Sequence, residues 1–449
     1  MERSSSLRME YLKIAHQVIT EPLLCHLNLL TPGGGDPTFG RSEIPYSAAE
    51  HRLIYSNPEV SAIRRRVLIP AHSLLESGSW DKEKWSWVTY YIWTCPAALE
   101  SEQLHSDIVM AHGINDYAGK LAPHALHFMK RGFRVIAIDL PSFGRSTGLH
   151  GYLPSMKINA RAMHAVVMDV RTWDEESGLL GRAGRERKLF AEGHSMGAFT
   201  VLYYAALYPP LMPGNDGGPD LSLKQVPSEQ AKTTTDEDLV EEALRAHEHT
   251  PLAHHRPEHT NGSSSTSSAV LPGKPTPYRP SLSGVAVAAP MITISSQSRP
   301  NKAIEYIAHV LRFFAGRLPL ASAIKGNVSD DPRVEDEFNA DPLTYKGKVR
   351  ISTGLAILDG IDDLAAKAHL ITCPLTIHHG ANDRVTDPNG SKQFFEKVGT
   401  PKEHKSIKIW PGYEHVMMKN VQGMSEEDTQ KTRAVLTEIG DWLVAQARK

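Results

Sequence analysis

The chain has 449 residues, of which 41% are hydrophobic and 22% are charged, and its formal net charge is -2 at pH 7. This composition excludes a wholly disordered chain and a protein with many membrane spans, and the near-neutral charge argues against nucleic-acid binding. Three cysteines, Cys25, Cys95 and Cys373, are too few for a disulfide framework, which favours a reducing compartment.

The first 60 residues are predicted to form a helical extension followed by a loop. Polar residues interrupt the Leu- and Ile-rich stretch 9–30, and the N-terminus lacks the apolar run of a secretory signal. We therefore expect no signal peptide and no transmembrane helix, and an intracellular protein that is cytoplasmic or peripherally attached to a membrane. A helix packed on the body of the protein is favoured over one that lies on a membrane.

Short apolar runs, each typical of a strand buried on both faces, alternate with helical patterns further along the chain. The predicted strands are 107–112, 134–140, 188–194, 284–289, 374–378 and 406–410. The predicted helices lie within 121–132, 156–173, 198–208 and 425–447. This order predicts an α/β fold with a doubly wound, mostly parallel sheet, in which active sites lie at the carboxyl ends of the strands.

The loop after the first of these strands is a candidate oxyanion loop. Residues 112–116 read HGIND, and the backbone N–H of Ile114 is placed to stabilise the oxyanion of an acyl-transfer intermediate. The second donor is expected to be the backbone N–H of Met196, which lies at a predicted helix N-terminus directly after Ser195, the candidate nucleophile. The alternative is an ordinary turn that ends a strand.

The nucleophile pattern G-x-S-x-G occurs twice. Residues 144–148 (GRSTG) have no helix after them, so we assign Ser146 to a loop. Residues 193–197 (GHSMG) join a predicted strand to a predicted helix, which is the setting that a nucleophile elbow requires. We therefore predict Ser195 as the nucleophile.

Residues 211–280 break the alternation. They are rich in Pro, Ser, Gly and Thr, so they cannot bury enough apolar area to offset the entropy of ordering, and we predict a largely disordered surface insertion. The insertion contains His247, His249, His254, His255 and His259. Without cysteines or a fixed fold a metal site is not favoured there, and we expect neither a metal nor a cofactor.

A serine nucleophile needs a base and a carboxylate that orients it, usually in the chain order Ser, Asp or Glu, His. Asp383 and His415 each follow a predicted strand, and we predict them as these partners. Asp387 is a rival that better suits a turn ahead of Pro388. His378 and His379 are rivals for the base, but they lie in or at the end of a strand, where packing is the expected role.

Seven segments together resemble the monoacylglycerol lipase and lysophospholipase group of the α/β-hydrolase superfamily, and two of them resemble its plant branch with the caffeoylshikimate-type esterases. They are residues 112–117 (HGINDY), 132–155 (GFRVIAIDLPSFGRSTGLHGYLPS), 193–198 (GHSMGA), 284–291 (GVAVAAPM), 341–354 (DPLTYKGKVRISTG), 378–388 (HHGANDRVTDP) and 411–418 (PGYEHVMM). The resemblance covers roughly 60–210 and 281–445, and it implies Ser195, Asp383 and His415 as triad with Ile114 and Met196 as oxyanion donors.

The resemblance also implies an inserted helical cap, or lid, at residues 291–369, within a core formed by 61–210 and 281–449. One helical face in the cap contains Ile304, Ile307, Leu311 and Phe314. These residues are expected to line an acyl-chain tunnel or to touch a membrane or lipid-droplet surface. Simple packing against the core is the equal alternative.

We therefore expect a serine hydrolase that cleaves carboxylic esters of lipid-like substrates, with monoacylglycerols as the first candidates. The alternatives are a lysophospholipase, and an esterase or acyltransferase acting on bulky or hydroxycinnamoyl esters. A non-catalytic binding module with the same fold is the alternative from another class. The oligomeric state does not follow from the sequence.

Overall fold

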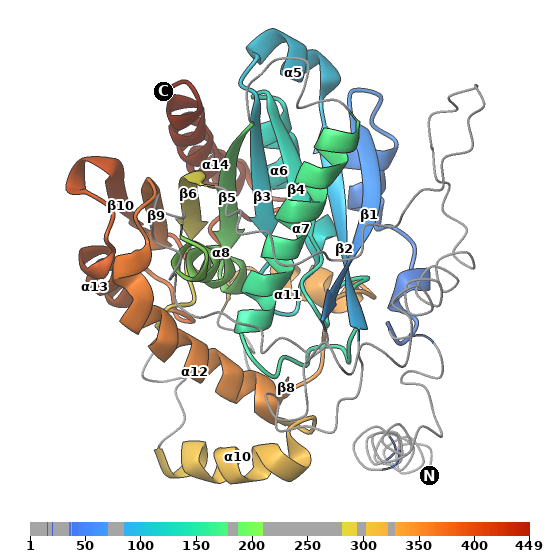
Figure 1. Ribbon diagram of the computed structural model, residues 1–449, viewed down its shortest axis with the longest axis vertical. Coiled ribbons are helices and arrows are strands. Elements are labelled where there is room, and N and C mark those ends of the chain that lie inside the picture. The colour runs from blue at the N-terminus through green and yellow to red at the C-terminus, as the bar shows by residue number, and fades with distance from the viewer. Residues whose placement is uncertain are drawn as a thin grey trace. The chain divides into compact units, whose positions relative to one another are not determined.

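The computed structural model describes residues 38–70, 85–177, 187–209, 281–293, 302–321 and 328–449, together with His16, Thr20 and Asp36 (Figure 1). The predicted insertion at 211–280 and, apart from His16 and Thr20, the stretch 9–30 lie outside these residues. The described elements belong to the compact unit formed by Met1–Pro209 and Ser281–Lys449.

Within the described residues, eight strands form one sheet in the order β1-β2-β4-β3-β5-β6-β9-β10. The strands are β1 (Ser61–Pro70), β2 (Trp85–Thr94), β3 (Ser106–Ala111), β4 (Phe133–Ile138), β5 (Lys188–His194), β6 (Leu282–Ala288), β9 (Leu375–Gly380) and β10 (Lys405–Trp410). The six from β3 onward are parallel, whereas β2 pairs antiparallel with both β1 and β4. The predicted doubly wound, mostly parallel sheet is confirmed.

Helices cover both faces of this sheet (Figure 1). The α-helices are α3 (Ala48–Glu50), α5 (Pro96–Glu102), α6 (Ala122–Met129), α7 (Lys157–Glu176), α8 (Met196–Leu207), α10 (Lys302–Ala315), α11 (Pro332–Ala340), α12 (Ile351–Lys367), α13 (Pro388–Lys397) and α14 (Glu426–Ala447). α7 and α8 pack on one face, and α6 and α14 on the other. None of the described helices is both long enough and apolar enough to cross a membrane.

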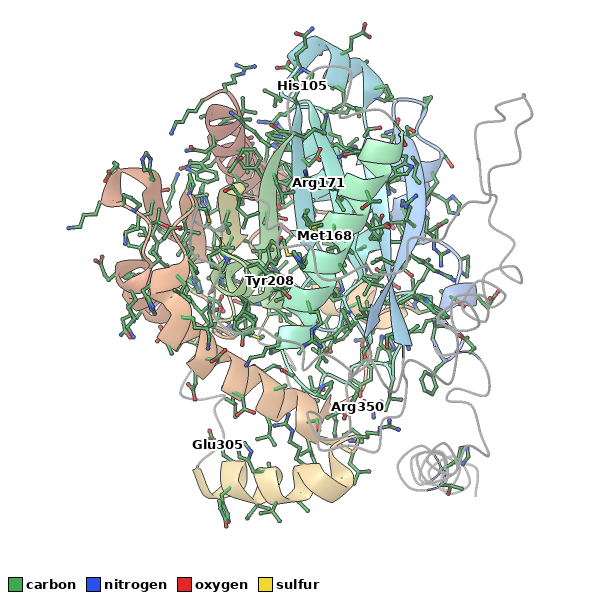
Figure 2. The ribbon with its side chains drawn as sticks, in the orientation of Figure 1. His105, Met168, Arg171, Tyr208, Glu305 and Arg350 are labelled. Atoms are coloured by element: carbon green, nitrogen blue, oxygen red, sulfur yellow. The ribbon has the colours of Figure 1, made fainter. Side chains whose placement is uncertain are left out.

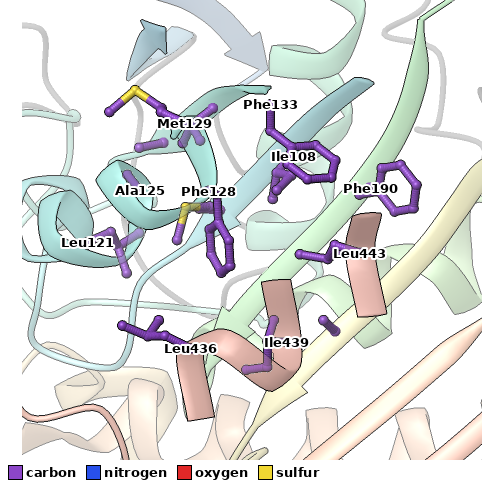
Figure 3. Close-up of a cluster of buried hydrophobic side chains, with 14 of the residues drawn as sticks. Ile108, Leu121, Ala125, Phe128, Met129, Phe133, Phe190, Leu436, Ile439 and Leu443 are labelled. Atoms are coloured by element: carbon purple, nitrogen blue, oxygen red, sulfur yellow. The ribbon is translucent and has the colours of Figure 1, made fainter. Parts of the chain in front are cut away.

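The face under α6 and α14 contains the main hydrophobic cluster, which Figure 3 shows in part. Phe128 of α6, Phe133 of β4 and Ile439 of α14 are each fully buried in it. All six residues of β3 and all six of β4 are buried, which explains why residues 108–111 and 135–138 are apolar without alternation. This rigid centre fixes the strand ends from which the candidate site is built.

Residues 38–60 are packed onto the same core. Ile54 belongs to the hydrophobic cluster, and the buried Arg41 donates from Nε to the carbonyl of Gly144 at 2.7 Å. In return, Arg145 donates from Nη2 to the carbonyl of Ile44 at 3.0 Å. The segment preceding β1 is therefore bound to the loop that follows β4.

β1 and β2 were not predicted from the sequence. Three consecutive arginines, Arg64, Arg65 and Arg66, interrupt the apolar pattern of β1. Arg65 donates to Tyr90 and Asp169, and Arg66 lies over the Trp87 ring. These contacts let polar side chains occupy both faces of an edge strand.

The segment 291–369, predicted as a cap, contains α10, β7 (Pro319–Ala321), α11, β8 (Val349–Arg350) and α12. α12 packs against α8, where a Cβ on Gly360 would lie 3.1 Å from the Phe199 ring. α10 packs in turn against α12 and lies at the edge of the structure, as Figure 2 shows around Glu305.

Candidate active site

Ser195 lies at the sharp turn between β5 and α8. Its backbone has φ 57° and ψ -119°, a strained conformation for a residue with a side chain. The flanking glycines are required by packing, because a Cβ on Gly197 would lie 1.9 Å from the carbonyl oxygen of Ala111 and one on Gly193 would lie 2.4 Å from the backbone of Gly197. This geometry presents the serine hydroxyl at the carboxyl edge of the sheet.

Two further strand ends bring the predicted partners to Ser195. His415 follows β10, and its Nε2 lies 3.0 Å from Ser195 Oγ. Asp383 follows β9, and its Oδ2 lies 2.7 Å from His415 Nδ1. Since β9 and β10 are parallel neighbours, their ends meet at one edge of the sheet. The structure thus places the three side chains in one buried hydrogen-bonded chain.

The Asp383 carboxylate accepts several further hydrogen bonds. The backbone N–H groups of Val385 and Thr386 donate to Oδ1 at 2.7 and 2.9 Å, and Thr386 Oγ1 donates to Oδ2 at 2.8 Å. Burial alone would raise the pKa of Asp383, but hydrogen bonds from His379 and His415 outweigh it and hold that pKa well below its usual range. The group is therefore an anion that can orient His415.

The candidate oxyanion loop lies directly beside the serine. A Cβ on Gly113 would be 3.7 Å from the Cβ of Ser195, so the backbone of Ile114, the next residue, passes close to the nucleophile. Met196 is the first residue of α8. Asn115 has φ 67°, and its carbonyl accepts from the backbone N–H of Tyr345 at 2.9 Å. The base of the predicted cap therefore supports this loop.

A polar network behind the loop was not predicted. Tyr117 donates its hydroxyl to Asp341 Oδ2 at 2.9 Å, and Lys120 lies 3.0 Å from Glu337 and 3.1 Å from Asp341. Burial raises the pKa of Asp116 to about 7, with Lys120 opposing the shift and the two carboxylates adding to it. More than 200 residues separate Tyr117 from Asp341, so no local pattern could have revealed their contact.

The four residues weighed as alternatives to Ser195, Asp383 and His415 each have hydrogen-bond partners of their own. Ser146 is fully buried, and its hydroxyl donates to the carbonyl of Asp139 at 2.5 Å. Asp387 caps the N-terminus of α13 by accepting from Asn389 N–H. His378 bonds to Thr376 and Trp410, away from the serine. His379 was expected only to pack, but it lies 3.1 Å from Asp383 Oδ2.

The residues expected to form a tunnel wall are only partly described. Ile307 and Leu311 are 57% and 38% exposed, next to Tyr306 at 72% and Val310 at 55%. The side chains of Ile304 and Phe314 lie outside the described part of the chain. The described part of this stripe is therefore an outer apolar surface of α10, because a different face of the helix packs on α12.

Within the described ranges, no group of three or more His, Cys, Asp or Glu side chains is arranged to hold a metal ion. The residues gathered at Ser195 are a hydroxyl, an imidazole and a carboxylate, which together suit proton transfer and nucleophilic attack.

Comparison with known proteins identifies one matching family and several related proteins. The family model described as "Serine aminopeptidase, S33" (Hydrolase_4) matches residues 102–214 and 259–422. The chain is 23% identical over 361 residues to a monoacylglycerol lipase of Mycolicibacterium smegmatis, covering 80% of this chain and 93% of that protein. It is 27% identical over 169 residues to the caffeoylshikimate esterase of Arabidopsis thaliana, covering 37% of this chain and 48% of that protein.

Among solved structures, the monoacylglycerol lipase of Paleococcus ferrophilus is similar with a TM-score of 0.49 and 17% identity, covering 85% of this chain and 99% of that one.

Proposed function

The chain belongs to the serine aminopeptidase S33 family of α/β-hydrolases, and from this premise we propose that it cleaves the carboxylic esters of lipid-like substrates, with monoacylglycerols first among them. The family model covers more than half of the chain, and the protein is a monoacylglycerol lipase-like α/β-hydrolase. The observation that carries the proposal is the 3.0 Å contact between Ser195 Oγ and His415 Nε2 at a strained strand-to-helix turn.

In the proposed acylation step, His415 Nε2 takes the proton of Ser195 as Oγ attacks the ester carbonyl carbon. The backbone N–H groups of Ile114 and Met196 stabilise the oxyanion of the tetrahedral intermediate. Its collapse breaks the bond to the alcohol, which leaves with the proton returned by His415. The product is an acyl group esterified to Ser195.

In the proposed deacylation step, His415 takes a proton from water, and the resulting hydroxide attacks the acyl-enzyme. Collapse of the second intermediate releases the fatty acid and returns the proton to Ser195. Asp383 stays ionised throughout, holds the Nδ1–H tautomer of His415 and stabilises the imidazolium that forms.

The substrate class rests on the relatives and on the cap. The Mycolicibacterium smegmatis relative named a monoacylglycerol lipase aligns over nearly its whole length. We propose that residues 291–369 act as the cap, and that the exposed apolar face of α10, with Ile307 and Leu311, touches the lipid surface that holds the substrate. The intracellular location stays a prediction.

A second candidate is an esterase for hydroxycinnamoyl esters, favoured by the 27% identity to the Arabidopsis thaliana caffeoylshikimate esterase over the matched 169 residues. Lysophospholipase activity and acyl transfer to an alcohol use the same acyl-enzyme. All of these share the roles proposed for Ser195, His415 and Asp383.

The substrate class can be tested by measuring kcat/KM across monoacylglycerols, lysophospholipids, short p-nitrophenyl esters and hydroxycinnamoyl esters, with glycerol added in a parallel series. We expect the highest value for a monoacylglycerol, with free fatty acid as the product. A hydroxycinnamoyl ester as the best substrate, or an acylated alcohol as the main product, would replace this proposal by the corresponding alternative.

A further inference from the structure

A second histidine lies on the carboxylate of Asp383. His379, near the end of β9, is fully buried, and its Nε2 lies 3.1 Å from Asp383 Oδ2. The same oxygen lies 2.7 Å from His415 Nδ1. Two imidazoles, one from β9 and one from the loop after β10, thus share one carboxylate oxygen.

The direction of the His379 hydrogen bond follows from the charge of its partner. An ionised carboxylate has no proton to donate, so His379 Nε2 must carry the proton. The other ring nitrogen, Nδ1, lies 2.7 Å from the hydroxyl of Ser391 on α13. The Nε2–H tautomer leaves Nδ1 free to accept from Ser391, so the tautomer and the ring plane are fixed from both sides.

The remaining donors to Asp383 come from its own turn, whereas His379 comes from the rigid strand before it. Val385 and Thr386 belong to the same turn as Asp383. His379 is anchored in β9, which pairs on both sides, with β6 and with β10. A bond to the strand therefore fixes the carboxylate relative to the sheet that also holds Ser195.

We propose that His379 is a positioning residue: by donating to Asp383 Oδ2 it fixes the carboxylate and withdraws part of the negative charge that faces His415. The proposal rests on the roles proposed above for Ser195, His415 and Asp383. The His379 ring has Asp383, Ser391 and Thr386 as hydrogen-bond partners, and Ser195 is not among them. Its effect would reach the reaction only through the orientation and the basicity of His415.

The other charged or titratable groups near His415 have hydrogen-bond or ion-pair partners other than Asp383. From β5, His194 Nε2 lies 2.8 Å from the carbonyl of His415, and burial, with the nearby charge of His415, lowers the pKa of His194 to about 3. From α6, His124 bonds to the Met418 carbonyl, and burial lowers its pKa. In the surrounding loops, ion pairs join Arg384 to Asp330 and Glu414, and Lys419 to Glu414.

The test is the pH profile of kcat for His379→Met and His379→Gln. Methionine fills the space without a donor, whereas the amide of glutamine can donate to Asp383 Oδ2 from a position close to that of Nε2. For His379→Met we expect kcat to fall by about tenfold with KM within about twofold. The acidic limb of the pH profile of kcat should move to higher pH by about half a unit. Without the donor from residue 379 the Asp383 carboxylate is more basic, and it then stabilises the protonated form of His415 more strongly. His379→Gln should restore most of kcat and return the limb toward the wild type.

The chain offers a matched control in His378, which is equally buried on the opposite side of β9 and bonds to Thr376 and Trp410. His378→Met should lower thermal stability without moving the acidic limb. Titration with a fluorophosphonate counts active sites, so kcat is normalised to active enzyme in every variant that keeps Ser195.

An acidic limb of His379→Met that coincides with the wild type would overturn the proposal, as would a His379→Gln variant as impaired as His379→Met. A Ser195→Ala protein measured beside them separates the role of His379 from the proposed function. If Ser195→Ala is inactive while the limb does not move, only the role of His379 is wrong. If Ser195→Ala keeps its activity, the proposed function itself fails.

Discussion

Glu192 of β5 is a buried carboxyl group three residues before Ser195 that the proposed reaction does not use. It is 1% exposed, and its Oε2 has no hydrogen-bond partner among the described residues. Burial raises its pKa from 4.5 to about 8. The folded protein therefore holds this proton over a pH range in which the unfolded chain releases it, and stability should fall as the pH rises from about 4.5 to about 8.

Replacing Glu192 by methionine should remove this pH-dependent penalty. We expect the free energy of unfolding of Glu192→Met to exceed that of the wild type by about 2–4 kcal/mol at pH 8, and by much less near pH 5. Urea denaturation at both pH values measures the difference. Glu100→Met, on the exposed face of α5, is the control. A difference of the same size at both pH values would show that the titration of Glu192 does not cause the pH dependence.

At the scale of single residues, the sequence predicts those features that depend on neighbouring residues in the chain. The glycine spacing around Ser195 matches close packing at Gly193 and Gly197, so the sharp strand-to-helix turn could be predicted without a structure. The choice between His378 and His379 could not be made in this way. Neighbouring residues on a strand point to opposite faces, and only the pairing of β9 decides which of them meets Asp383.

At the scale of elements, α10 is the least enclosed helix of the predicted cap. The broad apolar stripe was correctly placed on a helix, but its period could not say which side would pack on α12. Tyr306 and Val310 lie on the side that remains exposed. An exposed apolar surface on a helix of a lipase-like enzyme suits contact with aggregated lipid.

We expect the double variant Tyr306→Ser and Val310→Ser to lose activity only at lipid surfaces. Hydrolysis of monoacylglycerol in vesicles should fall by about tenfold, since the lost apolar contact weakens adsorption. Hydrolysis of a dissolved short p-nitrophenyl ester should stay unchanged. Ile63→Ser, at an exposed apolar position on β1, serves as the control. Equal losses on both substrates would contradict surface binding by α10.

At the scale of the whole molecule, buried polar groups join segments that are far apart in the sequence. Arg145 is 1% exposed, donates to the carbonyls of Ile44 and Pro45, and lies 3.6 Å from the buried Glu50. Tyr117 lies between Glu50 and Asp341, and so connects residues 38–60 to the base of the predicted cap. The first 60 residues could be predicted only as an extension, because these partners have no local pattern.

Arg145→Met should therefore destabilise the fold strongly. Removing the guanidinium leaves Glu50 buried without its cation, which costs about 3–5 kcal/mol of unfolding free energy. Chemical denaturation of the purified variant measures this loss. Arg433→Met, at an exposed position of α14, should change stability by less than about 0.5 kcal/mol. An Arg145→Met protein as stable as that control would contradict the role given to this buried contact.

The central claim is that Ser195 is the nucleophile of an ester hydrolase, and the most direct test is covalent labelling by a fluorophosphonate together with monoacylglycerol hydrolysis. The wild type and Ser146→Ala should both be labelled, since Ser146 is a buried loop residue. Ser195→Ala should lose the label, and its kcat should fall by at least about a thousandfold. A Ser195→Ala protein that is still labelled and still hydrolyses the ester at the wild-type rate would contradict the account.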